Sequence, residues 1–230
     1  MMWLSPSETE ALHLSLSVAA RSVACSLPLA IIVAWVLTRR RFAGRAMIDA
    51  VVHLPLVLPP VVIGYLLLLT FGARGAIGSW LARIAGIELI FTRNGAALAT
   101  AVMSFPLMVR SMRISLENVD CGLEDAARTL GAGAIDRFAT ITLPLMLPGI
   151  LAGGITAFSA ALGEFGAVIT FVSNIPGETR TLPLALYSAL QTPDGDAAAA
   201  RLAGISVALG LAGLLLSDWF ARRIRRVLGR

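Results

Sequence analysis

Few side chains in this chain could do chemistry within its apolar stretches, and Glu164 is the acid that interrupts the longest of them. An ionisable residue inside a membrane segment is rare and is a functional candidate by default. An enzyme working at membrane depth, such as a protease or an acyltransferase, would need paired catalytic groups. No Ser–His or Asp–Asp partnership is visible around Glu164, so the sequence argues against this class.

The basic residues exclude further chemistry, because all 19 of them are arginine and the chain has no lysine. A P-loop lysine, a Schiff-base lysine and a kinase-type lysine are therefore excluded. If the protein uses ATP, another chain must bind it, and we expect no cofactor on this one. Cys25 and Cys121 lie far apart in unlike surroundings, so we expect neither a disulfide nor a metal site.

The composition is that of a membrane protein. Hydrophobic residues make up 57% of the chain and charged residues only 14%, whereas a soluble domain has about 25% charged residues. The net charge of +5 could indicate a nucleic-acid partner. For so apolar a chain, arginines at the cytoplasmic face of a bilayer are the better explanation, and we expect no nucleic acid.

Five segments are long and apolar enough to cross a bilayer core of about 30 Å as helices. The sequence therefore predicts an all-α integral membrane protein with about five transmembrane helices in a single domain, residues 1–230. The prolines of the second segment, Pro55, Pro59 and Pro60, should kink or break it. The expected spans are about residues 12–37, 50–71, 95–109, 143–172 and 202–219.

The arginines also predict the orientation. With the N-terminus outside and the C-terminus inside, Arg21 lies within the first span and five arginines fall outside: Arg74, Arg83, Arg93, Arg180 and Arg201. Thirteen fall inside, which are Arg39, Arg40, Arg41, Arg45, Arg110, Arg113, Arg128, Arg137, Arg222, Arg223, Arg225, Arg226 and Arg230. This split strongly favours the N-out, C-in arrangement.

Two outer loops contain apolar patterns that predict short helices. In loop 72–94, apolar residues recur at helical spacing, which predicts a helix at the outer interface with Trp80 as its anchor. In loop 173–201, the apolar stretch from Leu182 to Leu190 predicts a re-entrant or interfacial helix.

The inside loop, about residues 110–142, has the most specific pattern. An apolar stripe at helical spacing is formed by Leu123, Ala126, Ala127 and Leu130. Asp120 can cap the start of this helix, Gly131 fits its end, and Glu124 and Arg128 are spaced as an i, i+4 pair. A second short helix is expected around residues 134–142. The loop is thus a helix–turn–helix at the cytoplasmic surface, and it could be a simple linker or a contact site for another protein.

The residue identities favour the contact site. Asp125-Ala126-Ala127 is followed after three residues by Gly131, and nine residues later by Ile141-x-Leu143-Pro144. This pattern resembles the EAA loop of ABC-importer permeases and implies a type I importer permease fold. In that family the loop docks on a separate cytoplasmic ATPase. Asp125 replaces the usual leading glutamate and Glu124 precedes it, so which carboxylate contacts the partner stays open.

Longer stretches are similar to one branch of this superfamily, the molybdate ABC transporter permeases. They include HLPLVLPPVVIGYLLL (53–68), AVMSFPLMVR (101–110) and GEFGAVITFVSNIPGETRTLP (163–183), and the resemblance extends from about residue 12 to 220. It implies a homodimer in the bacterial inner membrane. The expected partners are two ATPase subunits, which bind ATP and magnesium, and an external protein that supplies the oxyanion. Sulfate, thiosulfate or tungstate are alternative substrates.

The resemblance also predicts a role for the polar residues near the spans. An oxyanion that must pass through should meet weak neutral donors, and the candidates are Ser104, Thr170, Ser173, Asn174 and Thr181. Ordinary hydrogen bonding between helices is the alternative role for these residues. Glu164 would repel an oxyanion, so we expect a structural or gating role for it. A proton-coupled secondary transporter using Glu164 is a further alternative, which the EAA loop disfavours.

Overall fold

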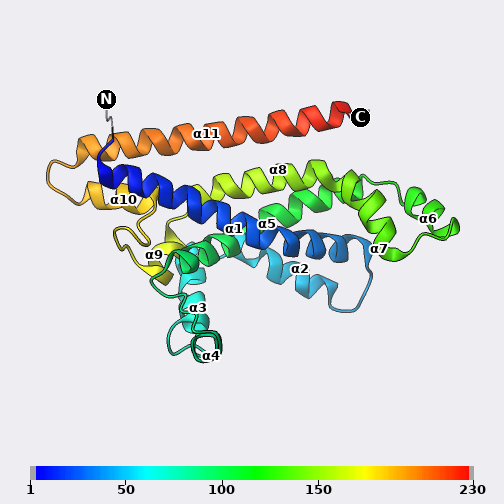
Figure 1. Cartoon of the computed structure of the whole chain (residues 1–230), viewed down its shortest axis with the longest axis horizontal. Coiled ribbons are helices and arrows are strands. Elements are labelled where there is room, and N and C mark those ends of the chain that lie inside the picture. The colour runs from blue at the N-terminus through cyan, green and yellow to red at the C-terminus, as the bar shows by residue number, and fades with distance from the viewer. Residues whose placement is uncertain (1–3, 228–230) are drawn as a thin grey trace.

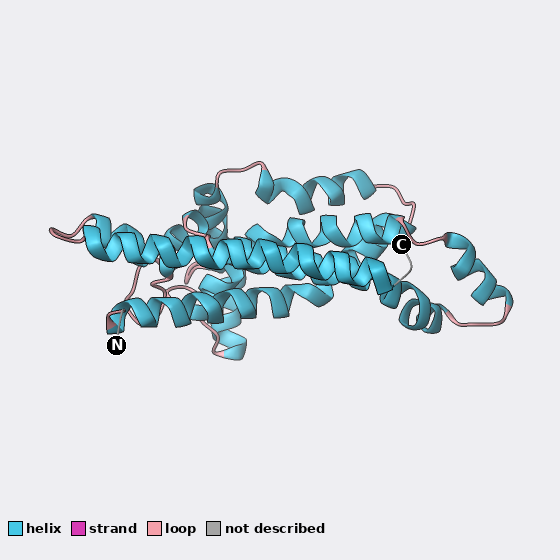
Figure 2. Cartoon of the chain, turned by 90° about the horizontal axis from the view of Figure 1, so that it is seen from above, coloured by secondary structure: helices cyan, strands magenta, loops and turns pink. Residues whose placement is uncertain are grey.

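The long helices lie side by side along the long axis of the molecule (Figure 1). The computed structural model describes residues 4–227, and all regular structure among them is helical (Figure 2). Within residues 4–227, four helices are long and apolar enough to cross a membrane, and there are five candidate spans if a sharply bent pair of helices is counted as one more. The expected all-α fold with about five spans is confirmed. The long helices are α1 (Pro6–Arg39), α5 (Arg93–Glu117), α8 (Leu143–Leu162) and α11 (Asp196–Val227).

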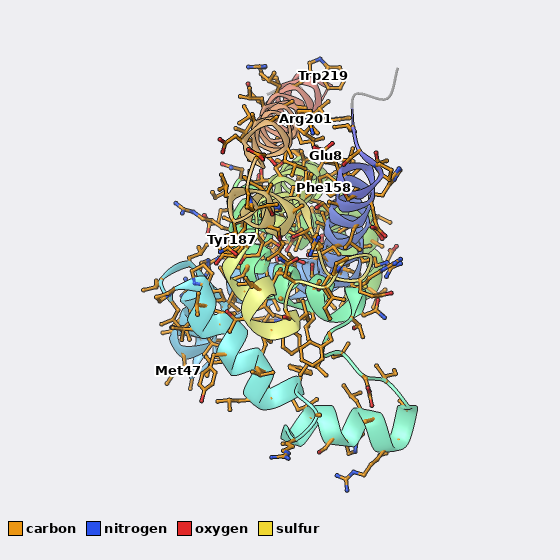
Figure 3. All side chains as sticks on the ribbon, turned by 90° about the vertical axis from the view of Figure 1, so that its left-hand side faces the viewer. Glu8, Met47, Phe158, Tyr187, Arg201 and Trp219 are labelled. Atoms are coloured by element: carbon orange, nitrogen blue, oxygen red, sulfur yellow. The ribbon has the colours of Figure 1, made fainter. Side chains whose placement is uncertain are left out.

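The second expected span is broken rather than merely kinked. Helix α2 (Arg45–His53) continues into a 3-10 turn (Leu54–Leu56), and α3 (Pro60–Phe71) then leaves at 114°. The break falls where proline rings remove backbone donors, and Pro59 adopts an extended conformation (ψ 136°) before Pro60. Helix α3 therefore runs at a steep angle to the long helices, packs against α9 (Gly166–Val172), and ends beside the expected interfacial helix, α4 (Ala76–Ala85) (Figures 1 and 3).

The fourth expected span is also divided. Helix α8 ends at Leu162, and a separate helix, α9 (Gly166–Val172), follows. The physical reason is Glu164, whose Oε1 accepts the backbone N–H of Ala167 at 2.9 Å and so satisfies a donor at the start of α9. The apolar run 143–172 thus contains one span and one short helix. The last expected short helix is present as α10 (Leu182–Leu190).

Helix α5 is the centre of the bundle and packs against both α1 and α8. Met108, Met112 and Leu116 of α5 are fully buried together with Leu37 of α1 and Met146 of α8. Close approach of α5 and α8 is permitted by small residues. A Cβ at Gly149 of α8 would lie 2.4 Å from the Cβ of Ser115, and the hydroxyl of Ser111 donates to the Gly149 carbonyl oxygen at 3.1 Å.

The two ends of the bundle are formed by different elements. The start of α1, α10 and the start of α11 lie at one end, called here the outer end, and the helices of the inside loop lie at the opposite, inner end (Figure 1). Arg230 lies outside the described residues, and the side chains of Arg223, Arg225 and Arg226 are not described.

An ion pair joins the first and last helices at the outer end. Ser5 and Glu8 form a capping box at the start of α1. The Glu8 Oε1 also accepts from Arg201 Nη2 at 2.8 Å and from Nε at 3.1 Å, and Glu8 is only 4% exposed. Figure 3 shows these two residues facing each other between α1 and α11. A buried carboxylate needs such partners, because an uncompensated charge is costly.

We therefore expect Arg201→Ala to destabilise the protein. The substitution leaves Glu8 without its arginine donor, which should lower the free energy of unfolding by about 1–3 kcal/mol. Thermal unfolding of the purified protein in detergent measures the effect. Arg83→Ala is the matched control, since Arg83 is exposed and its Nε donates to a backbone oxygen of its own helix. Equal melting temperatures for the two variants would contradict the prediction.

Candidate functional site

The inside loop folds as a helical hairpin that extends beyond the bundle at the inner end (Figure 1). Its first helix is α6 (Cys121–Thr129). The Asp120 carboxylate accepts the N–H of Gly122 at 2.8 Å, and Gly131 has φ +88°, in the left-handed region that glycine tolerates. Both predicted helix ends, the Asp120 cap and the Gly131 stop, are confirmed.

The second helix of the hairpin continues into a membrane span. Helix α7 (Ala134–Arg137) passes through a π-helical turn (Phe138–Thr142) directly into α8. Of the expected motif residues in this part, Ile141 and Leu143 are half-buried and Pro144 lies exposed in the first turn of α8. No residue outside helical structure separates α7 from α8, so the second helix of the hairpin and the span form one continuous helix, Ala134–Leu162.

The expected pair between Glu124 and Arg128 is wrong. The Glu124 Oε1 lies 3.3 Å from Arg39 Nη2 and accepts the Thr142 hydroxyl at 2.8 Å. Arg128 pairs instead with Asp125, at 3.5 Å. The reason is the direction of the side chains, because the Glu124 carboxylate reaches Arg39 of α1 and Thr142 before α8, whereas Asp125, the next residue along α6, is more exposed to solvent. The two side chains are 21% and 64% exposed respectively.

The open side of the hairpin presents apolar residues to solvent. Leu130 is 88% exposed and Ile135 is 85% exposed. Exposed apolar patches of this kind mark interaction sites, and small alanines beside them permit close approach by a partner. We call this patch the coupling surface; it consists of Leu123, Ala126, Ala127, Leu130 and Ile135.

The pathway candidates are distributed over two regions. Ser104 lies buried in the middle of α5, where its hydroxyl donates to the Thr100 carbonyl oxygen at 2.8 Å. Thr170 of α9 donates to the Gly166 carbonyl oxygen at the same distance. Each hydroxyl proton is thus used within its own helix. Glu164 lies at the break between α8 and α9, where it caps α9.

The other three candidates build the loop between α9 and α10. Ser173 has a positive φ of 66°. The Asn174 side chain accepts from Arg180 Nε at 3.0 Å and donates to the Ser188 hydroxyl at 2.8 Å. Thr181 is buried directly before α10, and its hydroxyl has no hydrogen-bond partner among the described residues.

Sequence reasoning missed two residues of these sites. The first is Thr179, which is fully buried, accepts the Ile175 N–H at 2.9 Å and donates to the Ser173 carbonyl oxygen at 3.0 Å. The turn-forming residues around Thr179 were the sequence feature that could have indicated its role. The second is Arg39, which the sequence assigned only to the inner group of arginines. Nothing in local spacing could pair it with Glu124.

The comparisons with known proteins agree with this arrangement. The family described as "Binding-protein-dependent transport system inner membrane component" matches residues 26–226, and the chain belongs to this family. It is therefore a multi-pass inner-membrane permease subunit. The fold is similar to that of a bacterial ABC transporter involved in alginate import, with a TM-score of 0.75 at 20% identity over 97% of this chain and 82% of the other. The expected type I importer permease fold is confirmed.

Two relatives match over almost their whole length. The chain is 58% identical over 229 residues to the molybdenum transport system permease protein ModB of Escherichia coli K12, covering 100% of both chains. It is 56% identical over 223 residues to the ModB protein of Haemophilus influenzae, covering 97% of both.

Proposed function

We propose that this chain is the membrane subunit through which an ATP-driven importer takes up molybdate by alternating access. The observation that carries the proposal is the 58% identity, over the full length, to a molybdenum transport permease. The stretches 53–68 and 163–183, which resemble the molybdate branch, fall within the matched region and support the same substrate.

The partners follow from what this chain has and lacks. The absence of lysine supports ATP and magnesium binding on a separate ATPase subunit. The coupling surface supports docking of that ATPase at the inner end, because its apolar residues are exposed beyond the spans. A second copy of the chain and an external oxyanion-binding protein complete the proposed complex.

The continuous helix from α7 to α8 gives a physical route for the transport cycle. When the ATPase subunits close, the docked hairpins must move, and α8 moves with them because no loop absorbs the displacement. The spans then open outward to accept the oxyanion, and ATP hydrolysis resets them. Packed helices transmit such rigid displacements because interiors are close-packed.

The polar residues along the spans fit weak contacts with a passing anion. Ser104 and Thr170 donate their hydroxyl protons to carbonyl oxygens of their own helices, so either hydroxyl would have to rotate away from that partner before it could donate to an anion. Glu164 has a gating role in the proposal, because it fixes where α8 ends and α9 begins. A carboxylate would repel an oxyanion, which argues against substrate contact at this residue.

The test is uptake by the complex purified in mild detergent and reconstituted with its binding protein. We expect an ATPase to co-purify, and molybdate to stimulate both ATP hydrolysis and uptake. Stimulation by sulfate or thiosulfate but not by molybdate would contradict molybdate as the substrate. Stimulation by tungstate alone would show that tungstate is the substrate instead. Uptake that needs a proton gradient but no ATP, and that is lost in Glu164→Gln, would show that the protein is a proton-coupled secondary transporter and not part of an ATP-driven importer.

A further inference from the structure

We propose that Glu124 is a positioning residue that holds the coupling surface in place. Its carboxylate fastens α6 to α1 and to the start of α8, so that displacement of α6 by the ATPase reaches two spans together. This inference rests on the proposed function, since it assumes an ATPase docked on α6. It also separates the two acids of the motif, because Asp125, whose side chain is 64% exposed, is then the carboxylate available to the partner.

The contacts of the Glu124 side chain join three elements at one atom. Oε1 lies 3.3 Å from Arg39 Nη2, at the last residue of α1, and 2.8 Å from the hydroxyl of Thr142, directly before α8. Arg39 Nη2 also donates to the Val119 carbonyl oxygen at 3.1 Å, in the link between α5 and α6. The ends of α1 and α5 and the beginnings of α6 and α8 therefore meet at this network.

Burial distinguishes this network from an ordinary surface ion pair. The side chains of Arg39 and Glu124 are 14% and 21% exposed, and Thr142 is 2% exposed. The pair between Arg128 and Asp125 is open to solvent, and exposed pairs of that kind contribute little to stability. A shielded pair with an additional hydroxyl donor interacts more strongly, because solvent screens it less.

Neighbouring contacts support the same arrangement. Arg137 Nη1 approaches the backbone oxygen of Glu124 at 3.5 Å, which joins α6 to α7. Trp35 of α1 packs edge-on against Phe138, with ring centroids 5.9 Å apart, at the point where α7 passes into the π-helical turn. The apolar contact fixes the distance between α1 and the α7–α8 helix, whereas the Glu124 carboxylate fixes the position of α6.

Without the carboxylate, α6 would lose its side-chain connection to α1 and to Thr142, and it would keep only its two short links, 118–120 and 130–133, and the long 3.5 Å contact between Arg137 and the Glu124 backbone oxygen. Motion of the coupling surface would then be absorbed in these links instead of displacing α1 and α8. We therefore expect loss of coupling between ATP hydrolysis and transport, with assembly retained.

The experiment compares Glu124→Gln, Arg39→Gln and the double variant in the reconstituted complex with its ATPase and binding protein. Each single variant should keep the co-purifying ATPase and its basal hydrolysis, but lose about tenfold in substrate-stimulated hydrolysis and uptake. The double variant should be no worse than either single one, because both remove the same interaction. The charge swap, Arg39→Glu with Glu124→Arg, should recover part of the stimulation.

Glu117→Gln is the matched control, because Glu117 is an exposed glutamate at the end of α5, outside the hairpin. It should behave as the wild type. Normal stimulation in Glu124→Gln would overturn the inference, and so would loss of the ATPase from that variant, since Glu124 would then contact the partner itself. A wild-type complex without an ATPase would overturn the proposed function, a result distinguishable from both.

Discussion

Uptake should be abolished in Ala127→Glu and in Gly131→Arg, although both proteins still insert into the membrane. Ala127 belongs to the coupling surface, and a glutamate there introduces a charge that docking would bury without a partner, which is strongly unfavourable. Gly131 has φ +88°, a conformation that costs an L-residue about 1–2 kcal/mol. An arginine at this position would both strain the end of α6 and place a long charged side chain beside Leu130.

The measurement is substrate-stimulated ATP hydrolysis and uptake by the reconstituted complex, with the amount of inserted permease determined separately. We expect both activities to fall at least about tenfold. Ala127→Ser controls for size, since it adds a hydroxyl without charge, and Gly131→Asn controls for conformation, since asparagine tolerates the left-handed region. Normal stimulation in the charged variants would show that the coupling surface is placed wrongly.

Local patterns were sufficient to predict the hairpin. The Asp120 cap, the stripe of α6 and the Gly131 stop each depend on residues within a few positions of one another, and the structure contains all three. The contacts of Glu124 could not be predicted in this way. Arg128 is at favourable helical spacing, but Arg39 and Thr142 come from other elements, and their better-shielded position prevails over the local pair.

The spans were predicted by length and hydropathy, but their breaks only partly. The prolines near residue 59 indicated a kink or a break, whereas the size of the bend, 114°, depends on how α3 packs against α9. The run 143–172 was predicted as one span, because Glu164 is the only charged residue that interrupts its high hydropathy. Glu164 was predicted to be structural or gating, and the cap it provides for α9 became visible only once the backbone N–H of Ala167 was placed beside it.

The partners of the polar candidates in the outer loop could not be predicted from the sequence either. Asn174 and Thr181 were selected as neutral donors near a span, which composition can indicate. Their partners depend on the fold of the α9–α10 loop, where Asn174 contacts Arg180 and Ser188. Whether they contact a passing anion stays a prediction.

Gly64→Leu should abolish transport by separating α3 from the bundle. A Cβ at Gly64 would lie 2.7 Å from the Ala167 carbonyl oxygen and 2.7 Å from the Thr170 Cβ, both in α9. A Cβ at Gly166 would likewise lie 2.7 Å from the Pro60 Cβ. The two helices therefore touch through glycines on both sides. Because backbone atoms of α9 form part of the contact, the strain cannot be relieved by turning a side chain.

The graded series Gly64→Ala and Gly64→Leu tests this packing by thermal unfolding in detergent and by uptake. Overpacking costs about 1–3 kcal/mol and more when backbone must shift, so alanine should lower the melting temperature and leucine should also remove uptake. Gly210→Ala and Gly210→Leu are the matched controls, since a Cβ at Gly210 of α11 meets nothing within 4 Å. Those variants should behave as the wild type, because the larger side chain there enters open space. Retained uptake in Gly64→Leu would mean that α3 does not need to pack this closely on α9 during transport.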